Sequence, residues 1–425
     1  SEVVHFEDVS NGTDVGSGIK THQTINKEVF LKKWRDVLEK EHFANARNVF
    51  QARERSATKR TVVFIDHYVP FFDKDAGSRS TYLYIKSMVD TGLNVKFVPA
   101  NFFPHQPYTR ILQQLGVEVL FGERYARSWK TWFSDNAQYI DVIYLHRPHI
   151  TEGFIDHMTR LQPRPKLIFF GHDLHYLRTN REGKIKGDQT IITAAEDWQR
   201  RELAIFKKVD KVYYPSEVEV AEVQRVSPGT NVSAIPLYFL NTPDIKQYRH
   251  RDRKGLLFGG GFGHPPNVDA VQWFVGKVLP ALVREVPDIC LHIVGSSVPS
   301  SIEKVADEHV KVYGFLSDED LKALYLKIRV AVVPLRFGAG VKGKILEALQ
   351  AGVPISTTSI GAEGLPEPYE VMAIADEPRE MAHQLLLLYN EPEECDRYLS
   401  KYREYIEKNF SQKKIQEIIT ADFLN

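Results

Sequence analysis

The sequence has little cysteine and no excess of charge of either sign. Its 425 residues include two cysteines, and 55 Lys and Arg residues balance 55 Asp and Glu residues. Two cysteines cannot form a disulfide framework, so a reducing compartment such as the cytoplasm is expected. A net charge of zero gives no general attraction to nucleic acid, and we expect no nucleic-acid partner.

Long apolar runs and the common catalytic signatures are also absent. No stretch approaches the roughly 18 apolar residues that a membrane span needs, and no signal-peptide pattern is visible. We therefore expect any membrane contact to be peripheral. The sequence contains no G-x-S-x-G, H-E-x-x-H or C-x-x-C motif, which leaves hydrolase and zinc-site interpretations without support.

Short apolar strands alternate with helical segments in two successive series. The first series of expected strands is 61–66, 94–99, 117–121, 142–146, 166–170 and 211–214. The second series is 255–258, 290–294, 310–313, 330–333 and 354–357. This alternation predicts α/β architecture, with two parallel sheets that each have helices on both faces. Two such domains in tandem leave a cleft, and ligands bind at the carboxyl ends of the strands.

Two segments differ from this alternation. Residues 1–59 predict a helical extension, in which Asn26 caps an amphipathic helix with Phe30, Trp34, Val37 and Leu38 on one face. Residues 237–254 are polar, carry a basic cluster and predict a linker. We therefore assign the first domain to 60–240 and the second to 250–411.

The segment 329–365 carries the strongest functional signal. An apolar strand leads into a glycine-spaced loop with Arg336, Lys342 and Lys344, and then into a helix with Glu347 near its start. Backbone N–H groups, the helix dipole and fixed cations all favour a phosphate there. A carboxylate beside a phosphate most often binds sugar hydroxyls. The alternative is an ordinary strand–loop–helix unit that happens to contain Gly and Lys.

A second anion-facing element follows the first strand. Gly77 and Ser78 can present backbone N–H groups at a helix N-terminus, and Arg79 can add a bidentate contact. The alternative is an ordinary turn with Ser78 as the N-cap. Asp73 and Asp75 suggest a metal site, but a hard cation needs more than two oxygen ligands, so we expect no metal.

Further polar residues follow other strands. His172 and Asp173 come after strand 166–170, where they can face the cleft and bind a substrate hydroxyl or a developing charge. A structural histidine is the alternative there. His146 and Arg147 present a similar but weaker case. The glycines at 259–263 allow close approach of a ligand, but the prolines that follow break the dinucleotide-binding pattern.

Three stretches together resemble the GT4 family of retaining glycosyltransferases, which have the GT-B fold. They are the Gly77 loop, GGGFGHPPNVDAVQWF at 259–274, and GAGVKGKILEALQAGVPISTTSIGAEGL at 338–365. The resemblance covers 60–425. It implies two Rossmann-like domains facing a cleft, with the C-terminal helix 412–425 returning to the first domain. It also implies transfer of a sugar from a nucleotide sugar with retention, without a metal or other cofactor.

The resemblance also implies roles for particular residues. Glu347 matches the second Glu of the family's E-x7-E motif, which holds the donor ribose, while Ala339 stands where the first Glu is expected. The residues assigned to catalysis are His172, Asp173, Lys342 and Arg336. Those assigned to donor binding are Gly77, Ser78, Arg79, Gly261, Tyr313, Phe315, Lys344, Glu347, Glu363, Gly364 and Leu365.

The first 59 residues resemble a different protein, the tail of a GT2-type glycosyltransferase with the GT-A fold. The matching text is VVHFEDVSNGTD, GIKTHQTIN and FLKKWRDVL, and His5 would correspond to a histidine that closes the donor site. This resemblance implies an upstream GT2 domain in a longer protein. The alternative is a plain helical extension.

Together these resemblances imply a hexosyltransferase-type enzyme of bacterial surface polysaccharide synthesis. The expected partners are a nucleotide sugar and an oligosaccharide or lipid-linked glycan acceptor. The expected location is the cytoplasm or the inner face of the membrane. Two alternatives stay open. The first is a non-catalytic glycan-binding or scaffold module, which the missing first Glu favours. The second is a GT-B-fold nucleotide-sugar epimerase.

Overall fold

The structure of the chain is a computed structural model that describes residues 21–44, 47, 50, 56–245 and 248–424. The chain divides into two compact units, Ser1–Thr61 and Val62–Asn425. Within the described residues, no helix combines the length and the apolar character that crossing a bilayer requires. The expected GT2-like stretch at 3–14, with His5, lies outside the described residues.

The first unit contains the long helix α1 (Thr21–Glu41). The predicted helix is confirmed, but its predicted start is wrong, because Asn26 lies inside the helix rather than at its cap. An exposed Asn costs little in a helix interior, so the helix continues through it. The predicted apolar face is exposed in this unit, since Phe30 and Trp34 are both exposed and no residue of α1 is buried.

The second unit begins with a seven-stranded sheet in the order β3-β2-β1-β4-β5-β6-β7. The strands are β1 (Thr61–Asp66), β2 (Asn94–Pro99), β3 (Glu118–Val119), β4 (Val142–His146), β5 (Lys166–Phe170), β6 (Lys211–Tyr214) and β7 (Val232–Ala234). Every strand pair is parallel. The strand order reverses direction between β1 and β4, which is where an open parallel sheet leaves a crevice for ligands.

Helices connect these strands on both faces of the sheet. They are α3 (Ala76–Asp90), α4 (Tyr108–Gln114), α5 (Glu123–Asn136), α6 (Pro148–Met158), α7 (His175–Lys186), α8 (Gln189–Phe206) and α9 (Glu217–Val226). The strands β1, β2 and β4 are buried along their whole length. Apolar runs of this kind are typical of parallel strands that are covered on both faces.

A second sheet of six parallel strands follows in the order β10-β9-β8-β11-β12-β13. The strands are β8 (Leu256–Gly259), β9 (Leu291–Val294), β10 (Val310–Gly314), β11 (Val330–Val333), β12 (Ile355–Thr357) and β13 (Ala373–Ile374). The helices are α10 (Pro265–Trp273), α11 (Leu279–Glu285), α12 (Ser300–Glu303), α13 (Asp318–Tyr325), α14 (Gly343–Gln350), α15 (Ser359–Ala362), α16 (Pro378–Asn390), α17 (Pro392–Asn409) and α18 (Gln412–Ile419). The predicted pair of doubly wound parallel sheets is confirmed.

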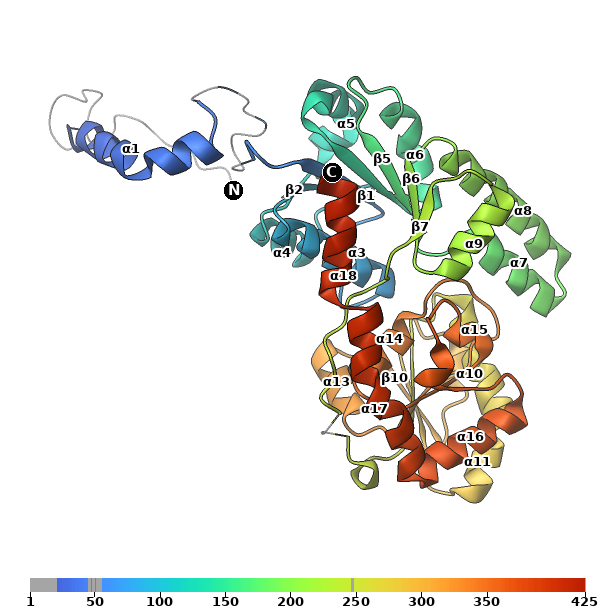
Figure 1. Cartoon of the computed structure of the whole chain (residues 1–425). Helices are drawn as coiled ribbons and strands as arrows, with labels where there is room; N and C mark the ends of the chain where they lie inside the picture. Colours follow the sequence, from blue (N-terminus) through green and yellow to red (C-terminus); the bar gives the residue numbers. More distant parts are fainter. Residues whose placement is uncertain (1–20, 45–46, 48–49, 51–55, 246–247, 425) are drawn as a thin grey trace. The chain divides into compact units, whose positions relative to one another are not determined.

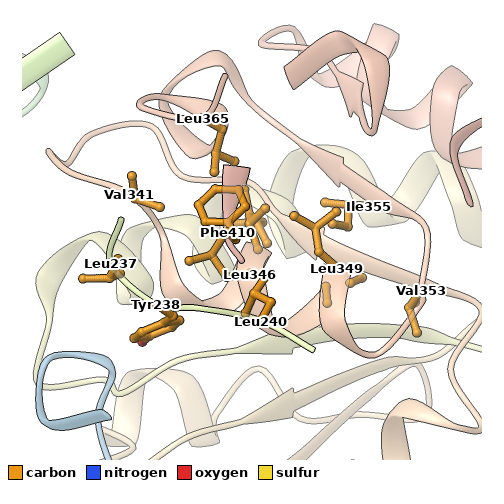
Figure 2. Close-up of a cluster of buried hydrophobic side chains, with 14 of the residues drawn as sticks. Leu237, Tyr238, Leu240, Val341, Leu346, Leu349, Val353, Ile355, Leu365 and Phe410 are labelled. Atoms are coloured by element: carbon orange, nitrogen blue, oxygen red, sulfur yellow. The ribbon is translucent and has the colours of Figure 1, made fainter. Parts of the chain in front are cut away.

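The predicted linker between the sheets is more than a polar connection. Leu237, Tyr238 and Leu240 are buried, and they lie in one apolar cluster with Leu346 of α14 and Phe410 (Figure 2). The backbone N–H of Leu240 donates to the carbonyl of Phe410 over 2.8 Å. The prediction of a polar linker is therefore wrong for these residues, because they form apolar core under the start of α14.

The C-terminal helices extend from the second sheet to the first (Figure 1). Helix α17 packs against α16, and α18 packs against α3 beside the first sheet. Lys166 of β5 donates to the carbonyl of Asp422 over 2.6 Å, and the Tyr213 hydroxyl donates to the Asp422 carboxylate. These contacts fasten the chain's last turn to the first sheet.

Candidate functional site

A cleft of about 520 Å³ lies at the carboxyl ends of both sheets within the second unit. It is lined by the turn before α3, the loop after β5, the glycine-rich loop after β8 and the loop before α14. The predicted site residues that line it are His172, Asp173, Lys342, Gly77, Arg79, Gly261, Phe315, Lys344 and Glu347. Segments that are far apart in the sequence thus meet at one place.

Two helix N-termini converge on this cleft. A Cβ atom added to Gly343, the first residue of α14, would lie 3.0 Å from the Cβ of Ala76, the first residue of α3. A Cβ on Gly77 would lie 2.5 Å from an Arg147 nitrogen, so a larger residue there would have to displace the Arg147 side chain. The first turn of a helix leaves N–H groups without intrahelical partners. Two such ends, together with the dipoles of both helices, form a site for an anion with more than one charge.

Lys344 and Glu347 face this anion site from α14. The Lys344 ammonium donates to the Asn267 side chain and lies 4.5 Å from the centre of the Phe258 ring. Burial lowers the pKa of Lys344 to about 7, while the neighbouring Glu347 opposes that shift. Burial likewise raises the pKa of Glu347, and Arg79 and Lys344 counteract it. A bound anion would restore the charge of Lys344.

Arg79 connects the two sides of the cleft. Its guanidinium lies 3.1 Å from Glu347 Oε1 and 3.1 Å from Asp318 Oδ1, and its Nε donates to the carbonyl of Phe72. The sequence predicted Arg79 as a bidentate contact of a bound anion, whereas the structure places it on the carboxylate expected to hold a ribose. Arg79 therefore orients Glu347 from the opposite side of the cleft.

Lys342 and Asp173 are buried and surrounded by charge. Burial lowers the pKa of Lys342, and Glu363, Glu219 and Asp173 counteract this effect. Burial alone would raise the pKa of Asp173, but Arg178, His175 and His264 together hold it well below its usual range. Asp173 is therefore ionised, and Lys342 is the cation that faces it across the cleft.

His172 stands on a strained backbone with φ of 63°. Its Nε2 lies 3.0 Å from Nδ1 of His146, and Nδ1 of His146 lies 3.8 Å from Oδ2 of Asp66. Burial lowers the pKa of His146 to about 4 and holds the pKa of His172 well below its ordinary value. Both rings are therefore neutral near pH 7, and Nδ1 of His172 has no hydrogen-bond partner among the described residues. That nitrogen is buried as well as unpartnered.

Asp66, His146 and His172 also form a set of donors that could hold a metal ion, with their ligand atoms within 4.8 Å of one another. Two observations argue against this use. Arg147 already pairs with Asp66 over 2.9 Å. The outer nitrogens of both histidines lack partners among the described residues, whereas a metal-bound histidine normally donates its other N–H. The direct hydrogen bond between the rings fits the observed contacts better.

Six predicted residues do not line the cleft. Ser78 is buried, and its N–H and hydroxyl both donate to Asp75, so Asp75 is the N-cap of α3 and the alternative assignment of Ser78 to that position is wrong. Arg336 pairs with Asp269 and Tyr313 stacks on His292. Glu363 pairs with Arg181. Gly364 packs near Ser216, and Leu365 lies in the core.

Several lining residues escaped the sequence-based assignment of roles. Asn267 holds Lys344, Asp318 binds Arg79, and Arg178 binds Asp173. His264 also lines the cleft, and burial lowers its pKa to about 4. The stretch GHPPN was visible as part of the glycine-rich segment, and that is the signal that could have pointed to His264 and Asn267.

Comparisons with known proteins agree with this fold. Residues 253–391 match the family Glycosyl transferases group 1. The fold is similar to that of a sucrose-phosphate synthase from Thermosynechococcus elongatus, with a TM-score of 0.67 at 16% identity over 85% of this chain and 98% of that one. The chain has the GT-B fold of glycosyltransferases.

Two further GT-B structures are similar to the chain. The pneumococcal O-GlcNAc transferase GtfA, solved with UDP and GlcNAc, gives a TM-score of 0.65 at 11% identity over 86% of this chain and 98% of that one. Anabaena HepE, solved with UDP and glucose, gives a TM-score of 0.60 at 16% identity over 85% of this chain and 98% of that one.

One curated relative is similar in sequence. It is an uncharacterized 44.6 kDa protein in the cps region of Klebsiella pneumoniae, 28% identical over 169 residues. The match covers 38% of this chain and 43% of the relative, less than half the length of each.

Proposed function

We propose that the chain is a retaining glycosyltransferase of GT4 type that moves a sugar from a nucleotide sugar to a glycan acceptor. The observation that carries this proposal is the convergence of the N-termini of α3 and α14 beside Lys344 and Glu347. Such a site matches a nucleoside diphosphate, because the diphosphate binds the N–H groups and the cation while the carboxylate accepts hydrogen bonds from ribose hydroxyls.

The same residues suggest how transfer is assisted. As the glycosidic bond breaks, negative charge builds on the leaving diphosphate, and both helix N-termini and Lys344 stabilise it there. Lys342 adds a second cation, which Asp173 and Glu219 hold in place. His172, which lines the cleft, meets a hydroxyl or the developing charge of the transferred sugar. Because all these groups belong to the protein, we propose that transfer needs no metal, and dialysis against EDTA should leave the activity unchanged.

The wider role that we propose is synthesis of a bacterial surface polysaccharide at the inner side of the membrane. The relative from the cps region supports this role, although the match covers less than half of either chain. We also propose that residues 1–59 are the end of an upstream GT2-type domain. Detecting a longer transcript and protein in the source cell would test that part directly.

The activity is tested with a panel of nucleotide sugars and oligosaccharide acceptors. We expect one donor to release its nucleoside diphosphate faster when an acceptor is present, and the product linkage to keep the anomeric configuration of the donor in an NMR spectrum. Conversion of the nucleotide sugar without any acceptor would instead identify an epimerase. Saccharide binding without affinity for any nucleotide would identify a non-catalytic module.

The role of Glu347 is tested by the variant Glu347→Ala. Loss of a charged acceptor of ribose hydrogen bonds costs about 1.5–3 kcal/mol, so we expect nucleoside diphosphate affinity to fall roughly 10- to 100-fold. Glu370, an exposed residue paired with Lys401, provides the control Glu370→Ala, which should leave the affinity unchanged. Unaltered affinity in Glu347→Ala would show that the ribose assignment is wrong.

A further inference from the structure

Aromatic and imidazole rings gather beside the cleft, at the carboxyl end of the first sheet. They come from two loops, those after β1 and β2. Tyr68 stacks on Phe71 with ring centres 4.6 Å apart, Phe71 contacts His105 at 5.0 Å, and His105 contacts Phe103 at 4.7 Å. His67 continues the row, 4.7 Å from Tyr68. We call these five residues the aromatic platform.

The platform is only partly covered by protein. Phe103 is 56% exposed, His67 is exposed, and Tyr68, Phe71 and His105 are half-buried. Tyr68 and Phe71 are stacked, and the other rings of the row meet tilted or edge-on. An exposed ring that continues such a row is a candidate surface for a ligand. The rings are held in fixed positions by their mutual contacts, which lowers the entropic cost of binding.

Polar groups border the rings. The Tyr68 hydroxyl donates to Asp75 over 3.3 Å. The Asn101 amide lies 3.2 Å from Nε2 of His105, and its oxygen accepts the N–H of Phe103 over 3.1 Å. Carboxylate, amide and imidazole groups at the edges of flat apolar rings suit a ligand that has both apolar faces and a rim of hydroxyls.

The platform adjoins the cleft. Lys74 and Asp75 both line the cleft, and the Lys74 ammonium lies 5.3 Å from the centre of the Phe71 ring. Asp75, which accepts the Tyr68 hydroxyl, also caps the helix whose N-terminus faces the anion site. A molecule seated on the platform would therefore reach the place where the donor sugar is released.

We propose that the aromatic platform is the subsite for the acceptor glycan, with sugar rings stacked on Phe103, His105 and Phe71. This inference rests on the proposed glycosyltransferase function. It identifies where the second substrate, the acceptor glycan, binds. A saccharide has flat C–H faces that pack on aromatic rings, and hydroxyls that bond to the surrounding carboxylate and amide. An anionic lipid surface would instead call for a cluster of unpaired cations. The border holds Asp75 and Asn101, and of the nearby cations Lys74 and Arg147 the second is paired with Asp66.

The test separates the acceptor subsite from the donor site. The full chain, with and without saturating nucleoside diphosphate (UDP, ADP, GDP, CDP and dTDP singly), is applied to a printed array of bacterial oligosaccharides and defined oligohexoses. Positive glycans are then titrated by calorimetry. In parallel, the melting temperature is measured with each nucleoside diphosphate. The variants are Phe103→Ala and Phe103→Trp, and the control is Tyr369→Ala, which removes a ring that is 70% exposed and belongs to the second sheet's side of the chain.

We expect Phe103→Ala to weaken glycan binding about fivefold, the loss of one stacked ring, and Phe103→Trp to restore it. Tyr369→Ala should bind as the unmodified chain does, and the nucleotide-induced rise in melting temperature should be the same in all four proteins. Glycan binding that is unchanged in Phe103→Ala would overturn the subsite, as would a chain that binds nucleotide and no saccharide. If no nucleoside diphosphate raises the melting temperature, that result would instead count against the proposed function. The glycan array would still show whether the platform binds saccharide.

Discussion

The His146–His172 pair joins the wall of the cleft to the core of the first sheet. Both rings are neutral, so one nitrogen of the 3.0 Å contact donates and the other accepts. The carboxylate of Asp66, 3.8 Å from Nδ1 of His146, favours a proton on that nitrogen. His146 then donates to Nε2 of His172, and His172 keeps its own proton on the buried Nδ1. His146 is thus a positioning residue.

Replacing His146 should alter His172 without changing the nucleotide site. In His146→Leu the hydrogen bond is lost, which is worth about 0.5–1.5 kcal/mol, so we expect kcat to fall about two- to tenfold with little change in donor KM. His146→Asn retains a polar atom close to the position of Nδ1 and should keep most of the activity.

Long-range ¹H–¹⁵N spectra of histidine-labelled protein would check the tautomer directly. We expect the Nδ1–H form of His172 in the unmodified chain and a mixture in His146→Leu. An unchanged spectrum together with a lower kcat would mean that His146 acts only on stability.

Lys344 gives the site a dependence on pH. Because burial lowers its pKa to about 7, the free protein loses this positive charge above neutral pH. Affinity for a nucleoside diphosphate should therefore fall as pH rises from 7 to 9, by up to about tenfold per unit, since binding must take up a proton. Calorimetry in buffers of different ionisation enthalpy would measure that uptake.

Two variants serve as controls for this titration. Lys344→Arg stays charged over the interval and should show a flat affinity, and Lys344→Met should bind weakly at every pH. The stability of the ligand-free protein should instead increase as pH rises. The unfolded chain keeps the proton up to about 10.5, so the free energy of unfolding rises with pH above 7. A pH-independent affinity in the unmodified chain would contradict the assignment.

At the scale of elements, sequence patterns predicted most of what is local. The strand, loop and helix around Lys342 follow from short-range periodicity and glycine spacing, and β11 begins and ends as expected. The pairing of Tyr313 with His292 and of Arg336 with Asp269 could not be predicted. Each pair joins residues that are distant in the sequence and meet only in the packed tertiary structure. The roles assigned to the site residues stay predictions until ligands are tested.

The close approach of α3 and α14 can be tested by a small change at Gly343. A Cβ there would lie 2.6 Å from the Tyr238 hydroxyl and 3.0 Å from Ala76, so Gly343→Ala must push the helices apart. Overpacking of this kind costs about 1–3 kcal/mol. We expect a lower midpoint in urea and at least tenfold weaker nucleoside diphosphate binding.

A second substitution should partly reverse this effect. Tyr238→Phe removes the atom at 2.6 Å, so the double variant should recover part of the affinity. Gly276→Ala, where an added Cβ has no atom within 4 Å, is the matched control and should change neither property. Normal nucleotide binding in Gly343→Ala would show that the distance between the helix ends is not critical.

At the scale of the whole second unit, ion pairs span the cleft between the parts built on the two sheets. Arg79 binds Glu347 and Asp318, and Arg181 donates to Glu363 over 2.8 Å and to the carbonyl of Gly338 over 2.7 Å. Arg181 and Glu363 do not themselves line the cleft. They affect ligands through the separation of the two sides and through the charge that both exert on Lys342.

Removing Arg181 should favour an open arrangement of these two sides. The pair is partly exposed, so its contribution is at most about 1 kcal/mol, and Arg181→Met should weaken nucleoside diphosphate affinity about two- to fivefold. The radius of gyration from X-ray scattering should rise in the ligand-free variant and return on saturation with nucleotide, because a ligand that binds both sides favours closure. Arg201→Met, which removes an ion pair with Glu152 inside the first sheet's side, should change neither quantity. A radius that is the same in Arg181→Met and Arg201→Met would show that Arg79 and the apolar contacts around Tyr238 suffice to hold the cleft closed.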